Sequence, residues 1–470
     1  MPYNLESPIL NIGNKYSWTL RNAVEGVQIF GGIGSGKTSG SGKMLAIKYL
    51  QAGFGGLVLS VKPDERKLWE GYCRETGRTN DLIIVHPDNR HRFNFIDYEM
   101  NREGAGAGLT ENLVMVLKTV INAGELQKKT LASNDAFWDN ALDMLIFNVI
   151  DLCQLAYETV TLKQLISIAQ SIPESPEKLK DPDFFLKNEF GKALFEIKLK
   201  RDEKRLSLKQ MRIYENAENY FLSNFIPLNE RTRSVIEHSF LGLLFQLDRD
   251  PVYSLFCSSE NNFKPEDSIG GKIIFIDLPI KYYDKVGRGI QILFKYIWQR
   301  AMERRNVADN DRPVFLWADE AQNFIHEHDI DYQATARSAR VCTVYLTQNM
   351  PNYFAHMGGD SGKYHVQSFL GTLGTKIFHA NTDNSTNQYA SDLIGKDMMI
   401  AQSGSKTMGK NYSKTTGWSE TRDYLVRPEQ FVFLRTGGAK NHYIVDGIMH
   451  CQDAPWKEEN SYHLAFFNQK

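Results

Sequence analysis

The chain has 470 residues, more than one compact core usually contains, so about two to four domains are expected. Hydrophobic residues make up 42% of it and charged residues 24%, a balance that excludes a largely disordered chain. A formal net charge of −1 gives no whole-chain basic field, so any nucleic acid must be bound by a local patch or a pore lining. The five cysteines form no CxxC pair, which disfavours a disulfide framework and a structural zinc site.

Short apolar runs of strand length cluster in two regions of the chain. In the first region they predict strands at Val27–Phe30, Gly56–Val61 and Leu82–Val85. In the second region they predict strands at Lys272–Asp277, Val314–Ala318, Thr343–Leu346 and Lys376–His379. These runs are apolar on both faces and are separated by segments of helix length. They therefore predict an α/β fold with a mainly parallel central sheet that helices cover on both sides.

The residues after the first predicted strand match the phosphate-binding pattern G-x-x-x-x-G-K-[ST]. They read Gly31-Gly32-Ile33-Gly34-Ser35-Gly36-Lys37-Thr38. Glycines let backbone N–H groups wrap the phosphates of ATP, Lys37 can reach the β- and γ-phosphates, and Thr38 can bind Mg²⁺. The competing interpretation is a glycine-rich turn before a helix, but the agreement of strand, loop and helix disfavours it. We expect ATP to bind through Gly31, Gly32, Gly34, Ser35, Gly36, Lys37 and Thr38.

The middle of the chain has a different periodicity. Apolar residues there recur at helical spacing, as in Phe137, Ala141, Leu142, Leu145 and Ile146. The pattern predicts an all-α domain inserted into the α/β domain. We therefore expect a nucleotide-binding domain made of residues 1–104 and 257–470, interrupted by an all-α domain at 105–256.

The strand Val314–Ala318 ends in two carboxylates, Asp319 and Glu320, which is the form of a Walker B element. Asp319 is expected to hold Mg²⁺, and Glu320 to polarise the attacking water. A strand followed by a solvated acidic turn is the alternative, and the P-loop in the same chain favours the catalytic interpretation. Gln348 follows the next strand, where it is either a γ-phosphate sensor or a simple strand-end cap.

The segment Gln402–Thr421 is rich in Ser, Thr, Gly and Lys and shows no periodicity, so it is expected to form an exposed loop or a loose hairpin. Elsewhere the longest apolar stretches are strand-sized, whereas a membrane span needs about 20 mostly apolar residues. No signal peptide is evident. We expect a cytoplasmic protein that could be recruited to the inner face of the cell membrane through a partner.

Together the motifs resemble the type IV secretion coupling proteins of conjugation, the TraG/TraD-like branch of the FtsK–HerA group of P-loop DNA pumps. Beyond the two ATP motifs, the resemblance is carried by segments spread over most of the chain. These are Leu57–Pro63, Phe93–Asp97, Phe137-Trp138 with Ala141, Thr232–Ile236, the series Asn381, Asp383, Ala390, Ser391 and Gly395, and Arg427-Pro428-Glu429. The first two depart from the family's Asp-Pro-Lys and Asn-Pro-Leu elements.

The resemblance implies a RecA-like nucleotide-binding domain in a homo-hexameric ring with single-stranded DNA passing through its pore. It also implies relaxase or relaxosome proteins and type IV secretion channel components as partners, with the all-α domain recognising substrate. Arg337 lies eleven residues before Gln348, as the family's trans-acting arginine does, and this raises it above Arg340. From the sequence alone, a solvated helix face is the better interpretation of each arginine. Family members usually carry two N-terminal membrane helices, which this sequence does not show.

Three functional hypotheses remain open. The first is an ATP-driven DNA-translocating motor of conjugative transfer, and the second is an FtsK–HerA-like translocase or helicase in DNA processing or defence. The third is an ATP-binding substrate receptor that hardly hydrolyses, against which an intact Glu320 counts. Basic and aromatic residues suited to gripping DNA occur in the Gln402–Thr421 segment, where they equally fit a solvated hairpin: Lys406, Lys410, Tyr412, Lys414 and Trp418.

Overall fold

The computed structural model describes residues 3–12, 15–125, 135–326, 328–357, 362–407, 413–454, 456 and 460–470. The chain divides into two compact units. The first consists of Met1–Leu82, Glu266–Phe275 and Gln299–Lys470, and the second of Ile83–Pro265 and Ile276–Trp298.

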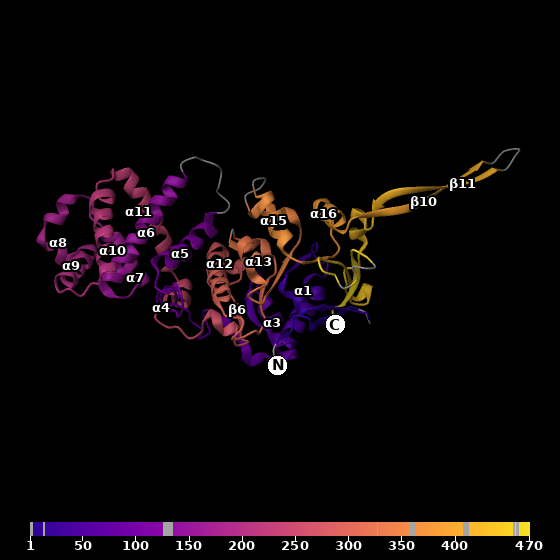
Figure 1. Cartoon of the computed structure of the whole chain (residues 1–470), viewed down its shortest axis with the longest axis horizontal. Coiled ribbons are helices and arrows are strands. Elements are labelled where there is room, and N and C mark those ends of the chain that lie inside the picture. Colours follow the sequence, from indigo (N-terminus) through magenta and orange to yellow (C-terminus); the bar gives the residue numbers. More distant parts are fainter. Residues whose placement is uncertain are drawn as a thin grey trace. The chain divides into compact units, whose positions relative to one another are not determined.

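The first unit is built on a large sheet (Figure 1). The strands of this unit are β1 (Pro8–Ile12), β2 (Tyr16–Thr19), β3 (Val27–Phe30), β4 (Gly55–Leu59), β6 (Ile273–Ile276), β7 (Val314–Ala318), β8 (Val341–Thr347), β9 (Thr375–Phe378), β10 (Lys396–Thr407), β11 (Ser413–Tyr424), β12 (Ile444–Cys451) and β13 (His463–Asn468). In the main sheet they follow the order β13-β12-β9-β3-β8-β7-β4-β6. Strands β9, β3, β8, β7 and β4 pair in parallel, and β12 pairs antiparallel with β9 and β13.

Helices of the first unit connect these strands. They are α1 (Leu20–Val24), α2 (Lys43–Gln51), α3 (Glu65–Glu75), α13 (His328–Ala336), α14 (Met350–His356), α15 (Lys363–Thr372) and α16 (Asn384–Ile394). Side chains of the parallel strands β3, β7 and β8 are buried on both faces, which is why their sequences are mainly apolar. On one face Trp69 of α3 stacks on Phe315 of β7, with ring centroids 5.6 Å apart.

The expected α/β fold with a mainly parallel sheet is confirmed. The expected strands at Val27–Phe30, Leu82–Val85 and Val314–Ala318 have the predicted bounds. Strand β8 is longer than predicted, and β4 stops at Leu59 instead of Val61. Beyond this point the Val61 N–H donates to the Glu65 carboxylate at 3.0 Å instead of to a neighbouring strand.

The second unit is mainly helical. Its elements are β5 (Leu82–Val85), α4 (Phe95–Asn101), α5 (Thr110–Glu125), α6 (Asp135–Tyr157), α7 (Leu162–Ser171), α8 (Pro182–Lys187), α9 (Glu189–Asp202), α10 (Leu208–Asn219), α11 (Glu230–Leu247) and most of α12 (Ile280–Arg304). Between residues 105 and 256, every regular element in the described part of the chain is a helix. Capping boxes fix two helix starts, with Thr161 pairing with Gln164 and Ser207 with Gln210.

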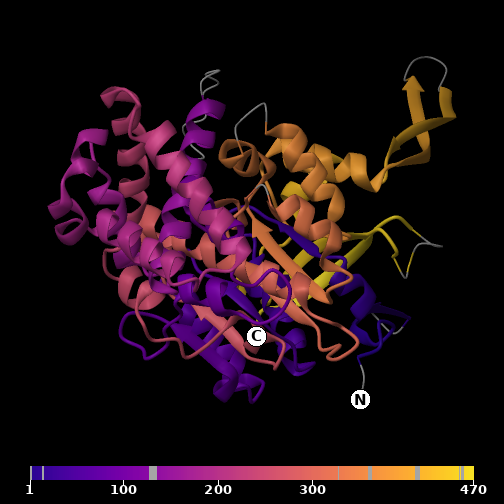
Figure 2. The same cartoon turned by 60° about the vertical axis from the view of Figure 1, so that its left-hand side comes forward.

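Strands β10 and β11 form a regular hairpin with an unbroken register from Lys396↔Tyr424 to Thr407↔Ser413. It extends away from the main sheet of its own unit (Figure 1 and Figure 2). Of the two forms expected from the sequence the hairpin is correct, but its strands are long and regular. Among the hairpin residues whose side chains the structure describes none is buried, so these positions require no apolar alternation. Lys410 and Tyr412 lie outside the described residues.

A search of the described helices for membrane-spanning candidates finds none long and apolar enough by itself. One pair, Trp138–Tyr157 and Leu162–Ser171, reaches the required length and composition only when taken together, and it is bent by 113°.

Candidate functional site

The glycine-rich loop joins β3 to a π-helical turn, Thr38–Gly42, and then to α2. Gly34 and Gly36 have φ values of +70° and +86°, which side-chain-bearing residues rarely adopt. A Cβ at Gly36 would also lie 2.5 Å from a methyl group of Val445 on β12. The Ser35 hydroxyl is buried and has no hydrogen-bond partner among the described residues. The loop therefore has the conformation and the unused polar group that a phosphate cradle needs.

The acidic end of β7 lies directly against this loop. Asp319 and Glu320 are both almost fully buried, with exposed fractions of 4% and 6%. The Thr38 hydroxyl donates a hydrogen bond of 2.9 Å to Asp319 Oδ2, and Lys37 Nζ lies 3.4 Å from Glu320 Oε1. Strands β3 and β7 both flank β8 in parallel, so their carboxyl ends meet at one edge of the sheet. Two pairs of adjacent residues that are distant from each other in the sequence thus form one cluster.

Glu320 is held in a strained backbone conformation. Its φ and ψ are 51° and 48°, the left-handed region that costs a residue with a side chain about 1 kcal/mol. Gln322 donates to its carboxylate at 3.0 Å, and Asn323 donates to its carbonyl oxygen at 2.9 Å. Burial alone would raise the pKa of Glu320, but the charge of Lys37, together with hydrogen bonds from Gln322 and Gln348, lowers it below its ordinary value. Glu320 is therefore an ionised carboxylate that its neighbours hold in one position.

Gln348 follows β8 at the same edge. Its Nε2 atom lies 3.2 and 3.3 Å from the two carboxylate oxygens of Glu320. Asn381, which follows β9, donates a hydrogen bond of 2.8 Å to the backbone oxygen of Gln348. The side chain of Gln348 is thus directed at the cluster, as a γ-phosphate sensor requires.

The cluster fits a magnesium–nucleotide complex chemically. Magnesium prefers hard oxygen ligands and is usually held by one or two protein groups together with phosphate oxygens and water. The Thr38 hydroxyl and the Asp319 carboxylate supply two such oxygens side by side. Among the residues that the structure describes there is no group of three or more His, Cys, Asp or Glu that could hold a metal without help. Phosphate oxygens would complete the coordination.

Comparisons with known proteins bear on the fold and on one segment. Residues 313–434 match the family model described as the TraM recognition site of TraD and TraG. The bacterial conjugative coupling protein TrwBdeltaN70, in its unbound form, superposes with a TM-score of 0.63 at 13% sequence identity and covers 96% of this chain and 86% of its own. No curated protein sequence matches the chain.

Two further structures of TrwB match over similar lengths. The complex with the non-hydrolysable GTP analogue GDPNP has a TM-score of 0.63 and 12% identity, covering 100% of this chain and 91% of that one. The complex with ADP and Mg²⁺ has a TM-score of 0.61 and 12% identity, covering 97% and 88%. This chain has the fold of a conjugative coupling protein. The matched segment 313–434 contains Asp319, Glu320 and Gln348, so the cluster lies partly within it.

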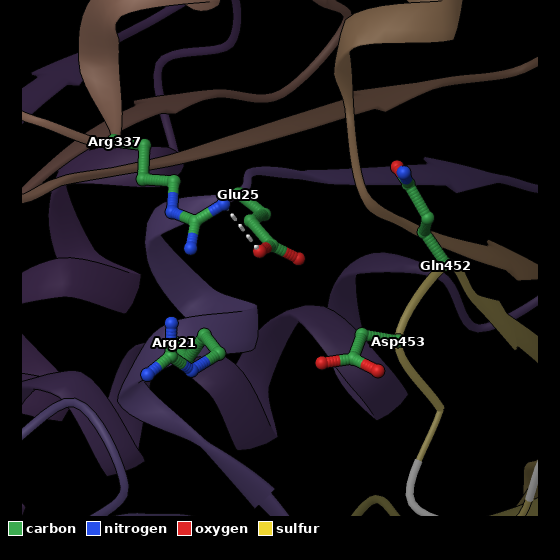
Figure 3. A pocket seen from close by; sticks show the side chains of 5 residues that line it. All are labelled: Arg21, Glu25, Arg337, Gln452 and Asp453. Carbon is green, nitrogen blue, oxygen red and sulfur yellow. Dashed lines mark ion pairs between the residues drawn. The ribbon is translucent and has the colours of Figure 1, made fainter.

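Arg337 lies at the opposite end of β8 from Gln348 and the ATP cluster. It precedes the amino-terminal end of β8, whereas Gln348 follows the carboxyl end. Arg337 lines a polar pocket of about 410 Å³ with Arg21, Glu25, Gln452 and Asp453 (Figure 3). Its guanidinium forms an ion pair of 3.3 Å with Glu25, and its side chain is 54% exposed. The structure therefore does not bring Arg337 to the ATP cluster of its own chain.

Several residues near the cluster were given no role from the sequence, although Lys62 lies in the segment Leu57–Pro63 that carries part of the family resemblance. Gln322 links the Glu320 carboxylate to the Thr347 hydroxyl, which donates to it at 2.7 Å. Glu65 is buried, and desolvation together with the charge of Asp319 raises its pKa to about 8. Lys62 lies near both Walker B carboxylates. The sequence offered one sign of this, because Lys62 and Glu65 directly follow a buried strand. That strand, β4, pairs in parallel with β7, so the residues after both strands lie at the same edge of the sheet.

His379 is hydrogen-bonded to Ser41, in the helical turn that follows the P-loop. Its Nδ1 atom lies 2.7 Å from the carbonyl oxygen of Asp446, and its Nε2 atom lies 2.7 Å from Ser41 Oγ. A carbonyl oxygen only accepts, so Nδ1 carries the proton and Ser41 donates to Nε2. Burial lowers the pKa of His379 to about 4 from its ordinary 6.5, and the charge of Lys37 acts in the same direction. The imidazole is therefore neutral at neutral pH.

This neutral histidine predicts a loss of stability in acid. Between pH 6.5 and 4 the unfolded state binds a proton at His379 that the folded state does not, so the free energy of unfolding falls as the pH falls. Below about pH 4 the loss from this group is complete. Urea unfolding of wild type and His379→Gln at pH 7 and pH 4.5 checks this. The variant is expected to lose less stability across that interval, and equal losses would contradict the assignment.

Proposed function

We propose that the cluster hydrolyses ATP. Lys37 binds the β- and γ-phosphates, Gln348 contacts the γ-phosphate, and Glu320 accepts a proton from the attacking water. The oxygen of that water forms a bond to the γ-phosphorus as the bond to the bridging oxygen breaks, which leaves ADP and inorganic phosphate. The observation that carries this proposal is the approach of Lys37 to Glu320 at 3.4 Å and of Thr38 to Asp319 at 2.9 Å.

Magnesium is the cofactor that these residues suit. Thr38 and Asp319 would hold it, Asp319 through a water molecule, and the ion would neutralise charge on the β- and γ-phosphates when bound. The structures of TrwB with nucleotide analogues and with ADP and Mg²⁺ are consistent with this choice.

We further propose that hydrolysis drives DNA translocation in conjugation. The chain would form a homo-hexameric ring, pass single-stranded DNA through its pore, and couple a DNA or relaxase–DNA substrate to a type IV secretion channel. The coupling-protein fold and the match of residues 313–434 to the TraM recognition site of TraD and TraG support this function. The helices in 105–256 would form the domain that recognises the substrate.

Single-stranded DNA is expected to stimulate ATP hydrolysis by the purified protein severalfold. Stimulation should weaken as salt rises, because DNA binding releases condensed counterions from the phosphates. Steady-state phosphate release with and without DNA, at increasing salt, measures this. Lys37→Ala should show no hydrolysis, whereas Lys48→Ala, an exposed lysine on α2, should behave as wild type.

The same assay separates the competing functions. Nucleotide binding without hydrolysis at any DNA concentration would replace the motor by an ATP-binding substrate receptor. Stimulated hydrolysis with no effect of gene deletion on conjugative transfer would indicate an FtsK–HerA-like translocase or helicase of DNA processing or defence. A cytoplasmic location with recruitment to the membrane through a partner stays a prediction, which cell fractionation with and without the secretion channel proteins tests.

A further inference from the structure

One carboxylate oxygen of Glu320 lies near side-chain nitrogen atoms of three residues, each of which follows a different strand. Lys37 Nζ, which follows β3, lies 3.4 Å from Glu320 Oε1, and Gln348 Nε2, which follows β8, lies 3.2 Å from it. A third nitrogen, Lys62 Nζ, forms an ion pair with the same oxygen at 3.7 Å. Lys62 belongs to neither ATP motif and has no role in the function proposed above.

Lys62 reaches the cluster because of the sheet register. Strand β4 pairs in parallel with β7, and Leu59 lies opposite Ala318. Residues that follow Leu59 therefore leave the sheet beside Asp319 and Glu320. Lys62 Nζ lies 3.8 Å from Asp319 Oδ2 as well as 3.7 Å from Glu320 Oε1, so it approaches both Walker B carboxylates.

The two lysines of the cluster differ in their freedom to move. The Lys37 side chain is 9% exposed, whereas the Lys62 side chain is 37% exposed. The distances from Lys62 to the carboxylates suit an ion pair and exceed those of a direct charge-assisted hydrogen bond. Burial lowers the pKa of Lys62, but Asp319 and Glu320 outweigh this effect and raise it, so the side chain is a cation. It is thus a loosely held positive charge at the solvent side of the cluster.

The donors around Glu320 Oε1 match the needs of a γ-phosphate. A terminal phosphate presents anionic oxygens that bind ammonium and amide N–H groups, the same groups that meet at this carboxylate oxygen. When magnesium binds at Asp319, its double positive charge would repel the nearby ammonium of Lys62. Repulsion from the metal would thus weaken the pair of Lys62 with Asp319, while the phosphate would offer Lys62 new anionic oxygens.

We propose that Lys62 is a γ-phosphate-binding residue that pairs with Asp319 and Glu320 when no nucleotide is bound and moves to the γ-phosphate when ATP binds with Mg²⁺. This inference rests on the ATP site proposed above and adds a second lysine to it. The move leaves Glu320 free to accept a proton from water. ADP has no γ-phosphate, so Lys62 should discriminate ATP from ADP.

Binding affinities test this role without relying on hydrolysis. Titration calorimetry with Mg²⁺ and either a non-hydrolysable ATP analogue or ADP is carried out on wild type, Lys62→Met and Lys62→Arg. Lys62→Met should bind the ATP analogue about tenfold or more weakly, the usual effect of losing a charge-assisted hydrogen bond, with ADP affinity unchanged. Lys62→Arg should keep most of the discrimination. Lys67→Met, an exposed lysine on α3, is the matched control.

The outcomes separate this inference from the function beneath it. If Lys62→Met binds the ATP analogue as tightly as wild type does, or loses affinity for both nucleotides equally, Lys62 does not contact the γ-phosphate. Intact ADP binding shows that the variant is folded. If wild type and Lys67→Met bind neither nucleotide, the ATP site itself is wrong, and the role of Lys62 falls with it.

Discussion

Glu320→Gln is expected to bind ATP normally and to hydrolyse it at least about a hundredfold more slowly than wild type. The amide keeps the shape of the side chain and can still contact its neighbours, but it cannot take a proton from water. Because Gln322 and Asn323 hold the residue in place, the local backbone should not change. Single-turnover hydrolysis measures the chemical step, and calorimetry with magnesium–ATP measures binding.

Lys37→Ala provides the contrast to this variant. It should lose both binding and hydrolysis, because Lys37 contacts the phosphates in the ground state as well as in the transition state. Both variants must keep the unfolding transition of wild type. If Glu320→Gln hydrolysed ATP at the wild-type rate, another group would be the base and the role assigned to Glu320 would be wrong.

Arg337→Ala is expected to reduce hydrolysis by about a thousandfold while leaving ATP binding intact, if Arg337 acts as an arginine finger. It can do so only on the nucleotide of a neighbouring copy. The seven residues of β8 are among the ten that separate Arg337 from Gln348, and a strand of this length spans about 20 Å. The pair with Glu25 holds the guanidinium at the edge remote from its own P-loop.

Mixing variants tests this action between copies. Arg337→Ala retains an intact P-loop, and Lys37→Ala retains an intact arginine. In an equimolar mixture that exchanges subunits within a ring, about a quarter of the interfaces combine the two intact groups, so part of the hydrolysis should return. Arg340→Ala is the control, since its guanidinium contacts the backbone of Tyr3, and it should remain active. No recovery in mixtures of proven hybrid rings would contradict action in trans.

The strength of the sequence interpretation lies in contiguous motifs. The P-loop is a run of adjacent residues whose backbone conformation the glycines largely dictate, and the acidic strand end needs only a strand followed by a bend. Both are local properties, and the buried parallel strands that carry them have apolar sequences because both faces are covered. The sequence therefore determined the α/β class, the bounds of β3 and β7, and the residue types that suit ATP and Mg²⁺.

Tertiary structure decided which distant residues meet. Lys62, Glu65 and His379 lie outside the two ATP motifs, and strand order and register bring them to the cluster or beside the P-loop. The extended strand β8 separates Arg337 from the P-loop of its own chain. The sequence spacing between Arg337 and Gln348 could not reveal this separation. Long-range pairing depends on how whole strands order in the sheet, and no local pattern encodes that order. The residues of an ATP site could thus be named from the sequence, while the second lysine beside it became visible only in the fold.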